Sequence, residues 1–261
     1  MKANINGITL NYTLDGPEDA PVVLMSHSLM CGTAMWDQQM VALSAYRVLR
    51  VDTRGHGQSE ASVGPYSLED LAGDFVGLLD HLGIEKVHFV GLSMGGMIGQ
   101  VLGVSHADRV LSLTLCDTMC EVPESAGGMW QERINQAETL GVGAMVDGTI
   151  ERWFSGEFCA RRPDLVNPIR ELIRTTPLPG FIGCCHAISR LNMTSRLASI
   201  TTPTLVIVGK DDLGTPVSAA QQIQQNIPGA ELVIIDDALH LSNMEQPEVF
   251  NKALTGFLSR H

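Results

Sequence analysis

Residues 87–99 read VHFVGLSMGGMIG, and the break inside this stretch decides the fold. An apolar run ends at Ser93, and Gly91 and Gly95 stand two residues away on either side. A sharp turn from a strand into a helix forces its central residue into an unfavourable backbone conformation, which requires neighbours without side chains at those two positions. Gly96 lets the new helix pack closely on the sheet. The stretch therefore predicts a strand, a strained turn that presents one serine, and a helix.

The G-x-S-x-G pattern alone arises by chance in roughly one chain in six of this composition, so the rest of the chain has to support it. Several other runs are apolar throughout, which is typical of parallel strands covered on both faces. Helical patterns lie between them, such as 67–83, which begins at a capping serine and ends at a glycine, and 217–229. This alternation predicts a doubly wound α/β domain. The expected strands are 8–14, 22–27, 46–52, 87–93, 111–117, 204–212 and 231–236.

One interval interrupts the alternation. From Glu121 to about Ser199 no strand pattern is convincing, while tryptophans, arginines and short helical patterns crowd together. We expect a helical cap over residues 123–196, inserted into a core made of 1–122 and 197–261. A segment of this kind is a natural lid that shapes a substrate pocket.

Composition narrows the classes of function. The chain has 261 residues and a formal net charge of −12, which argues against binding to nucleic acid or to anionic membranes. Its first residues lack a signal-peptide pattern, and no apolar stretch approaches the roughly 18 residues that span a membrane. The six cysteines show neither metal-ligand nor disulfide spacing, so we expect buried thiols in a reducing cytoplasm. No metal or cofactor and no partner beyond a small-molecule substrate is expected, and the oligomeric state stays open.

A serine hydroxyl becomes a nucleophile when a base removes its proton and an acid orients that base. His240 follows a strand and precedes the last helical pattern, so it is expected at the same sheet edge as Ser93. Asp211 and Asp212 end a strand at that edge, and Asp117 ends the strand before it. The residues alone barely separate these three carboxylates.

The charge that develops on the substrate carbonyl needs hydrogen-bond donors. The backbone N–H of Met94 follows the nucleophile at a helix N-terminus, where an anion is favoured. The second donor is expected from the loop SHSLM (26–30), at the N–H of Leu29. His27, in this loop, and His56, in a glycine-rich turn, could line the pocket, although a structural role in the turn is favoured for His56.

These blocks together resemble the α/β-hydrolase superfamily over nearly the whole chain, and they imply its fold with a helical cap. The family pattern G-x-x-D-x-x-T-P then points to Asp212 as the acid. Within the superfamily, the SHSL loop, the segment Met35-Trp36-Asp37 and the turn DTRGHG are most similar to 3-oxoadipate enol-lactonases, which act in the breakdown of aromatic compounds. Cofactor-free haloperoxidase-like esterases share most of the same blocks.

The resemblance also guides the choice of substrate contacts. Enol-lactonases act on a lactone that carries a carboxylate, and a bidentate arginine is the usual partner for such a group. Which arginine serves here stays open, and packing of the tryptophans and solvated charge for the arginines are the favoured interpretations against which substrate contact is weighed. A departure from the family is Met30, where we expect glycine and where a larger side chain would narrow the pocket mouth. The candidate substrate contacts are Trp36, Trp130, Trp153, Arg133 and Arg190.

The sequence thus predicts a metal-independent serine hydrolase of small esters or lactones, most like 3-oxoadipate enol-lactonase. Ser93 forms the acyl-enzyme, His240 is the base and Asp212 the acid. A general carboxylesterase or a perhydrolase would use the same three residues. A hydrolase-like ligand receptor is the remaining alternative, although the cap shows no pattern typical of partner docking.

Overall fold

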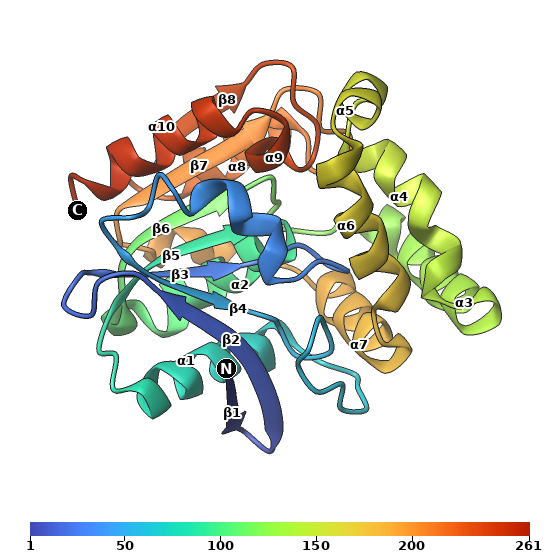
Figure 1. Ribbon diagram of the computed structural model, residues 1–261, viewed down its shortest axis with the longest axis horizontal. Coiled ribbons are helices and arrows are strands. Elements are labelled where there is room, and N and C mark those ends of the chain that lie inside the picture. The colour runs from blue at the N-terminus through green and yellow to red at the C-terminus, as the bar shows by residue number, and fades with distance from the viewer.

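The structure, a computed structural model, describes residues 1–261 apart from the side chain of Glu124 and the surroundings of Gly127. Within these residues, eight strands form one sheet in the order β1-β2-β4-β3-β5-β6-β7-β8 (Figure 1). The first two strands pair antiparallel with their neighbours, and all later pairs are parallel. Their bounds are β1 Lys2–Ile5, β2 Ile8–Asp15, β3 Val22–Ser26, β4 Arg47–Val51, β5 Val87–Leu92, β6 Val110–Cys116, β7 Thr204–Gly209 and β8 Glu231–Ile235.

All seven strands expected from the apolar runs are present, with ends that differ by no more than three residues. The strand that the sequence did not indicate is β1, a four-residue segment at the sheet edge. Its residues alternate between exposed and buried, and so short an alternation is a weak signal. The α/β fold predicted from the sequence is confirmed.

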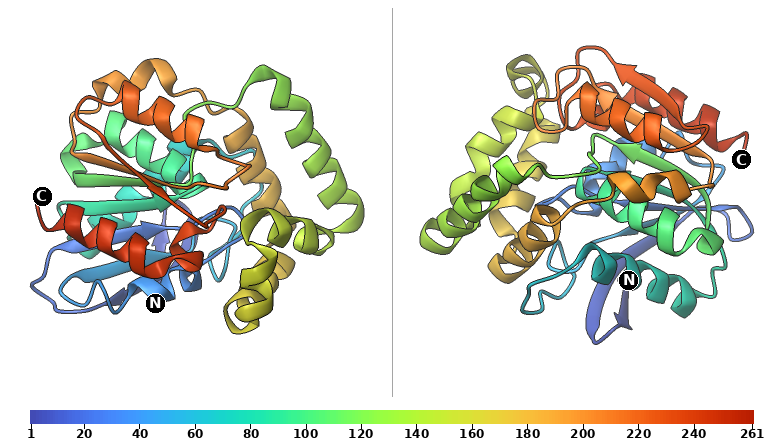
Figure 2. Two further views of the ribbon diagram at one scale, coloured as in Figure 1. Left: turned by 90° about the horizontal axis from the view of Figure 1, so that it is seen from above. Right: turned by 180° about the vertical axis from the view of Figure 1, so that it is seen from behind.

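Helices cover both faces of the sheet (Figure 2). On one face lie α1 (Leu68–Leu82), α2 (Met94–Ser105) and α8 (Val217–Asn226). On the other face α10 (Pro247–Leu258) lies beside the 3₁₀ helix η1 (Thr33–Gln39). The first of these helices begins as the sequence indicated, because the Asp70 N–H donates to Ser67 Oγ over 3.0 Å and the Ser67 N–H donates to the Asp70 carboxylate over 2.9 Å.

Five further helices, α3 to α7, form the cap beside the core (Figure 1). The chain enters and leaves the cap through a narrow neck, in which Val122 N–H donates to Leu191 O over 3.0 Å and Met193 N–H donates to Cys120 O over 2.7 Å. The following 3₁₀ helix η5 (Thr194–Ser199) packs on α2 and α8 of the core. The helices α3 to α7 thus lie between two crossings of the chain that pair at Glu121 and Asn192. Its helices are α3 Gly127–Leu140, α4 Val146–Trp153, α5 Gly156–Arg161, α6 Pro163–Thr175 and α7 Leu178–Ser189.

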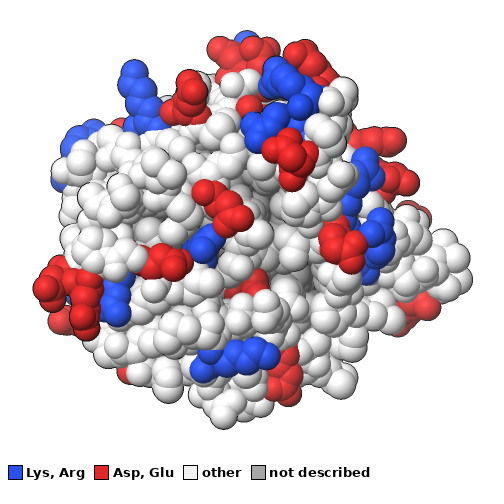
Figure 3. Space-filling view, viewed as in Figure 1, with Lys and Arg blue, Asp and Glu red and all other residues white. Residues whose placement is uncertain are grey.

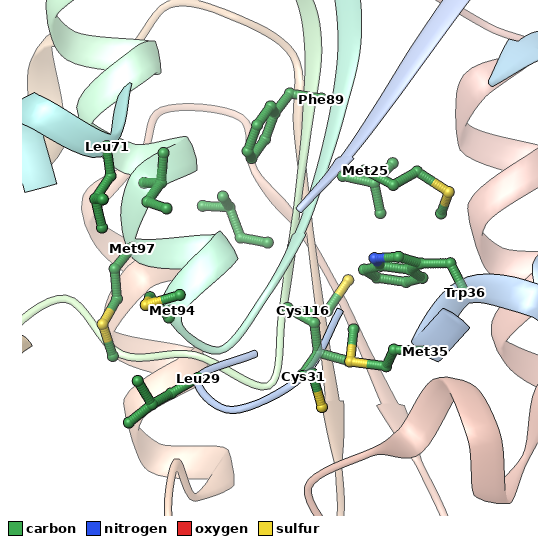
Figure 4. Close-up of a cluster of buried hydrophobic side chains, with 14 of the residues drawn as sticks. Met25, Leu29, Cys31, Met35, Trp36, Leu71, Phe89, Met94, Met97 and Cys116 are labelled. Atoms are coloured by element: carbon green, nitrogen blue, oxygen red, sulfur yellow. The ribbon is translucent and has the colours of Figure 1, made fainter. Parts of the chain in front are cut away.

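The core beneath the site is tightly filled with apolar side chains. Figure 4 shows part of it, with Trp36 and Met25 on one side of the central strands and Phe89 and Met97 on the other. All six cysteines are free, and five of them are buried as expected, whereas Cys159 is only partly buried.

The surface carries charge of both signs. Acidic and basic side chains are interspersed over the face seen in Figure 3. Among the described residues, no helix has both the length and the apolar character needed to cross a bilayer.

Candidate active site

Ser93 occupies the strained turn that the sequence indicated, between β5 and α2. Its backbone has φ 57° and ψ −114°, a region that residues other than glycine rarely adopt. A Cβ atom at Gly91 would lie 2.2 Å from Gly95 O, and one at Gly95 would lie 2.3 Å from Ser26 O. Both glycines are therefore required by close backbone packing, which confirms the predicted reason for the motif.

His240 and Asp212 form a buried pair at the same end of the sheet. Nδ1 of His240 lies 2.8 Å from Oδ2 of Asp212. The other carboxylate oxygen accepts the N–H groups of Gly214, over 2.8 Å, and Thr215, over 3.0 Å. The exposed neighbour Asp211 makes no such contact with His240. The geometry thus agrees with Asp212 as the acid.

The pair sets the charge state of the base. Burial lowers the pKa of His240, but the negative charge and hydrogen bond of Asp212, aided by Asp117, raise it above the ordinary value of 6.5. Burial raises the pKa of Asp212 and the contact with His240 more than offsets it, so that this pKa is lowered. With the Nδ1 proton donated to Asp212, Nε2 is the ring nitrogen left to accept a proton.

Asp117, the third carboxylate, has a different place. It is fully buried at the end of β6, where Oδ1 accepts the Gly209 N–H over 2.7 Å and Oδ2 lies 2.6 Å from Ser242 Oγ. Burial, with the charge of Asp212, raises the pKa of Asp117 to about 8. Asp117 therefore joins the ends of two strands to the loop that carries His240, and is not itself the hydrogen-bonded partner of the histidine.

The loop expected to hold the oxyanion follows β3. Leu29 and Met94 are both buried and belong to one apolar cluster (Figure 4). Neither backbone N–H donates to an acceptor among the described residues. Two free N–H groups, one of them at the start of α2, are what a developing oxyanion requires.

His27 fixes this loop from inside the protein. Its Nε2 accepts the Thr53 N–H over 2.9 Å, so Nδ1 carries the proton and donates to Ser28 O over 2.7 Å. Both His27 and His56 are fully buried, so neither lines the pocket, and the burial of His56 agrees with a structural role in its turn. A polar residue at the end of an apolar strand was the only sequence signal for this role.

Met30 also differs from expectation. Its φ of 62° lies in the left-handed region, which explains why glycine suits this position. The side chain has no exposed surface, because it packs into the core. It therefore does not narrow the pocket mouth.

Three of the five candidate substrate contacts lie in the cap helices. Trp153 contacts the triad residue His240, and Arg133 and Trp130 contact each other. The indole of Trp153 lies against His240, with 5.9 Å between ring centroids. On α3, the guanidinium of Arg133 lies over the ring of Trp130 at 4.9 Å. Burial lowers the pKa of Arg133, and no described acidic side chain lies within 4.0 Å of its guanidinium. After the larger effects of burial and Asp212, the charge of Arg133 lowers the pKa of His240.

The other two candidates lie elsewhere. Trp36 is completely buried and packs on Phe250 at 6.3 Å between ring centroids (Figure 4). A side chain without accessible surface cannot contact a substrate, so Trp36 is not a substrate contact and the packing role favoured from the sequence agrees with the structure. Arg190 is exposed at the end of α7, and the structure gives it no contact with the triad.

Among the described residues, no cluster of three or more histidine, cysteine, aspartate or glutamate side chains is placed to hold a metal ion. The arrangement can activate a serine hydroxyl, stabilise an oxyanion and attract an anionic substrate group.

Comparisons with known proteins agree with this geometry. Residues 21–247 match a family model described as alpha/beta hydrolase fold. The chain is 38% identical to 3-oxoadipate enol-lactonase 1 of Acinetobacter baylyi, over 99% of this chain and 96% of that protein. The crystal structure of the enol-lactonase from Burkholderia xenovorans LB400 is similar with a TM-score of 0.96 and 38% identity, over 99% of this chain and all of that one. A thermophilic esterase from Thermogutta terrifontis with malate bound gives a TM-score of 0.92 at 29% identity, over 100% of this chain and 98% of that one.

Proposed function

Because the chain belongs to the α/β-hydrolase family, we propose that it is the serine hydrolase that opens 3-oxoadipate enol-lactone. Full-length similarity to enol-lactonases makes it a hydrolase of carboxylic esters or lactones. The choice of this lactone rests on the named relatives and on a cap arginine, Arg133, that has no acidic partner among the described side chains.

The chemistry follows from the triad. Ser93 Oγ attacks the lactone carbonyl while Nε2 of His240 takes its proton and Asp212 holds the imidazole in place. The N–H groups of Leu29 and Met94 bind the oxyanion. The ring C–O bond then breaks, His240 returns the proton to the enol oxygen, and the enol collapses to a ketone. A water molecule deprotonated by His240 finally hydrolyses the acyl-enzyme.

Arg133 is the observation that carries the choice of an anionic substrate. Its partly buried guanidinium stacks on Trp130 and has no carboxylate partner among the described residues, and after the larger effects of burial and Asp212 its charge lowers the pKa of His240. A buried cation of this kind is costly unless an anion joins it. The carboxylate of the lactone supplies that anion, and the malate-bound esterase shows that a relative of this fold accepts a dicarboxylate.

The test compares two substrates. We expect wild type to cleave 3-oxoadipate enol-lactone much faster than p-nitrophenyl acetate, and Ser93→Ala to cleave neither. Arg133→Gln should raise KM for the lactone about 10- to 100-fold, the value of a charge-assisted pair, while the neutral ester is unaffected. The matched variant Arg190→Gln removes an exposed arginine of the same cap and should change neither reaction.

Two results would contradict the proposal, one for the substrate and one for the arginine. If wild type prefers the neutral ester, the protein is a general carboxylesterase and the lactonase proposal is wrong. If Arg190→Gln rather than Arg133→Gln raises KM, the carboxylate is bound at the other arginine.

The compartment is part of the same proposal. Six free thiols within one chain support a reducing environment such as the cytoplasm. Alkylation of the thiols in intact cells, followed by mass spectrometry, checks this point.

A further inference from the structure

Glu245 links two parts of the protein that are far apart in the sequence. It ends the short helix α9 (Ser242–Glu245) and its side chain is only 5% exposed. Oε1 accepts both the N–H and the hydroxyl of Ser155, each over 2.8 Å. Oε2 accepts the N–H of Leu239 over 2.6 Å. One carboxylate thus ties the cap to the residue that precedes His240.

A second contact joins the same two segments. The N–H of Leu241, the residue after His240, donates to the carbonyl of Trp153 over 3.3 Å. Both neighbours of His240 are therefore held, one by Glu245 and one by the cap backbone. The ring of Trp153 covers the imidazole between these two attachments.

We propose that Glu245 is a positioning residue for the base: it fastens the cap segment Trp153–Ser155 to the loop of His240 and so fixes the imidazole relative to Ser93. The inference rests on the proposed role of His240 in hydrolysis. It differs from simple stabilisation of the cap, because the bonded N–H of Leu239 belongs to the residue beside the base. A buried carboxylate with three donors is held in one geometry, as a positioning group must be.

The surroundings allow the link to be removed without unfolding the chain. Glu245 borders a polar cavity of about 400 Å³, shared with Ser155 and Leu239. Water from this cavity can satisfy the donors that a smaller side chain would leave free. The loop then keeps its hydrogen bonds but loses the fixed position that the carboxylate gives it.

The experiment measures kcat and KM for p-nitrophenyl acetate, a neutral ester that does not depend on Arg133. Glu245→Gln keeps the shape of the side chain, but its N–H₂ group cannot accept a hydrogen bond and faces a donor of either Ser155 or Leu239. Glu245→Ala removes all three hydrogen bonds. Both should lower kcat about 10- to 100-fold with KM within about twofold, because a displacement of about 1 Å in a catalytic group has an effect of that size. Glu248→Gln makes the same change of charge on an exposed residue three positions later and serves as the matched control.

A double variant tests whether the effect passes through the link. Ser155→Ala removes one of the three bonds and should give a smaller loss of kcat. In Glu245→Ala/Ser155→Ala the two effects should not add, because both changes break one connection. Circular dichroism and thermal melting establish that each variant is folded at the assay temperature.

The outcomes separate the two proposals. If wild type cleaves neither this ester nor the enol-lactone, the hydrolase function itself is wrong. If wild type is active and folded Glu245→Gln and Ser155→Ala both keep full kcat, Glu245 does not position the base. Losses of kcat that simply add in the double variant would also overturn the inference.

Discussion

The indole of Trp153 lies over the imidazole of His240 with an angle of 31° between the ring planes. The cap therefore covers His240, the proposed general base, directly through Trp153 at the end of α4. Burial lowers the pKa of His240, and Trp153 of the cap contributes to that burial. The cap therefore helps to set the pKa of His240. Changes in the cap should consequently be visible in the titration of the base.

Removal of this cover is the first prediction. In Trp153→Ala the imidazole gains contact with water, so burial opposes its charge less and its pKa rises. The acidic limb of kcat/KM should move to higher pH, and the maximum rate should fall by up to about 100-fold as the ring loses its support. The pH profile of ester hydrolysis measures both effects, with Trp153→Phe as the aromatic control. An unchanged limb in Trp153→Ala would show that the cap does not affect the titration of His240.

The pH dependence of the wild type is the second prediction. His240 accepts a proton only when neutral, and its pKa lies above 6.5 because Asp212 outweighs the effect of burial. Activity should therefore be lost as pH falls through this raised pKa, and kcat/KM should reach its plateau only above it. Initial rates between pH 5 and 9 test this, and a flat profile across that range would contradict the assignment of the base.

Substitution of the acid is the third prediction. Asp212→Asn removes the charge that raises the pKa of His240 and favours the wrong tautomer, so kcat should fall about 10⁴-fold. Asp211→Asn changes the adjacent, exposed carboxylate and should leave kcat within about twofold. Steady-state rates with either substrate distinguish them. Equal losses in the two variants would mean that sequence and structure have identified the wrong acid.

The fourth prediction concerns stability and Asp117. Its folded pKa of about 8 exceeds the ordinary 3.8, so the folded state holds a proton that the unfolded chain has lost. This contribution is complete below about pH 4 and is lost as pH rises through 8. Asp117→Asn mimics the protonated form, because its amide donates to Ser242 while its oxygen accepts from Gly209.

Melting temperatures of wild type and Asp117→Asn, taken at pH 5, 7 and 9, provide the measurement. The difference should grow in favour of the variant as pH increases. Asp211→Asn, which alters an exposed carboxylate, should follow wild type. Parallel curves for Asp117→Asn and wild type would mean that Asp117 is charged throughout the range.

Most of the fold could be predicted from the sequence, because the strands are continuous apolar runs and glycines mark the turns between them. Ser93 and His240 could be predicted as nucleophile and base because both follow strands, and the carboxyl ends of parallel strands meet at one edge of the sheet. Asp211 and Asp212 could not be separated by that argument, because adjacent residues share the edge and only the turn decides which one faces the histidine.

Contacts between distant segments account for what the sequence did not reveal. Trp36 is a packing residue because Phe250, far along the chain, fills the space beside it. Glu245 acquires its partners only when the cap folds over the core, 90 positions from Ser155. Neither relationship has a periodic pattern that a reading of the chain could detect.

The neck at Glu121 and Asn192 has a consequence for how such a protein diversifies. The two crossings of the chain pair with each other here, while the hydrogen bonds of Glu245 to Ser155 and of Leu241 to Trp153 attach the inserted helices to the core at a second place. An alternative set of helices grafted at these two positions would meet the same catalytic platform without any change in the strand order. Substrate preference can thus change with the inserted helices, provided that the new helices also form the hydrogen bonds that hold the segment around His240.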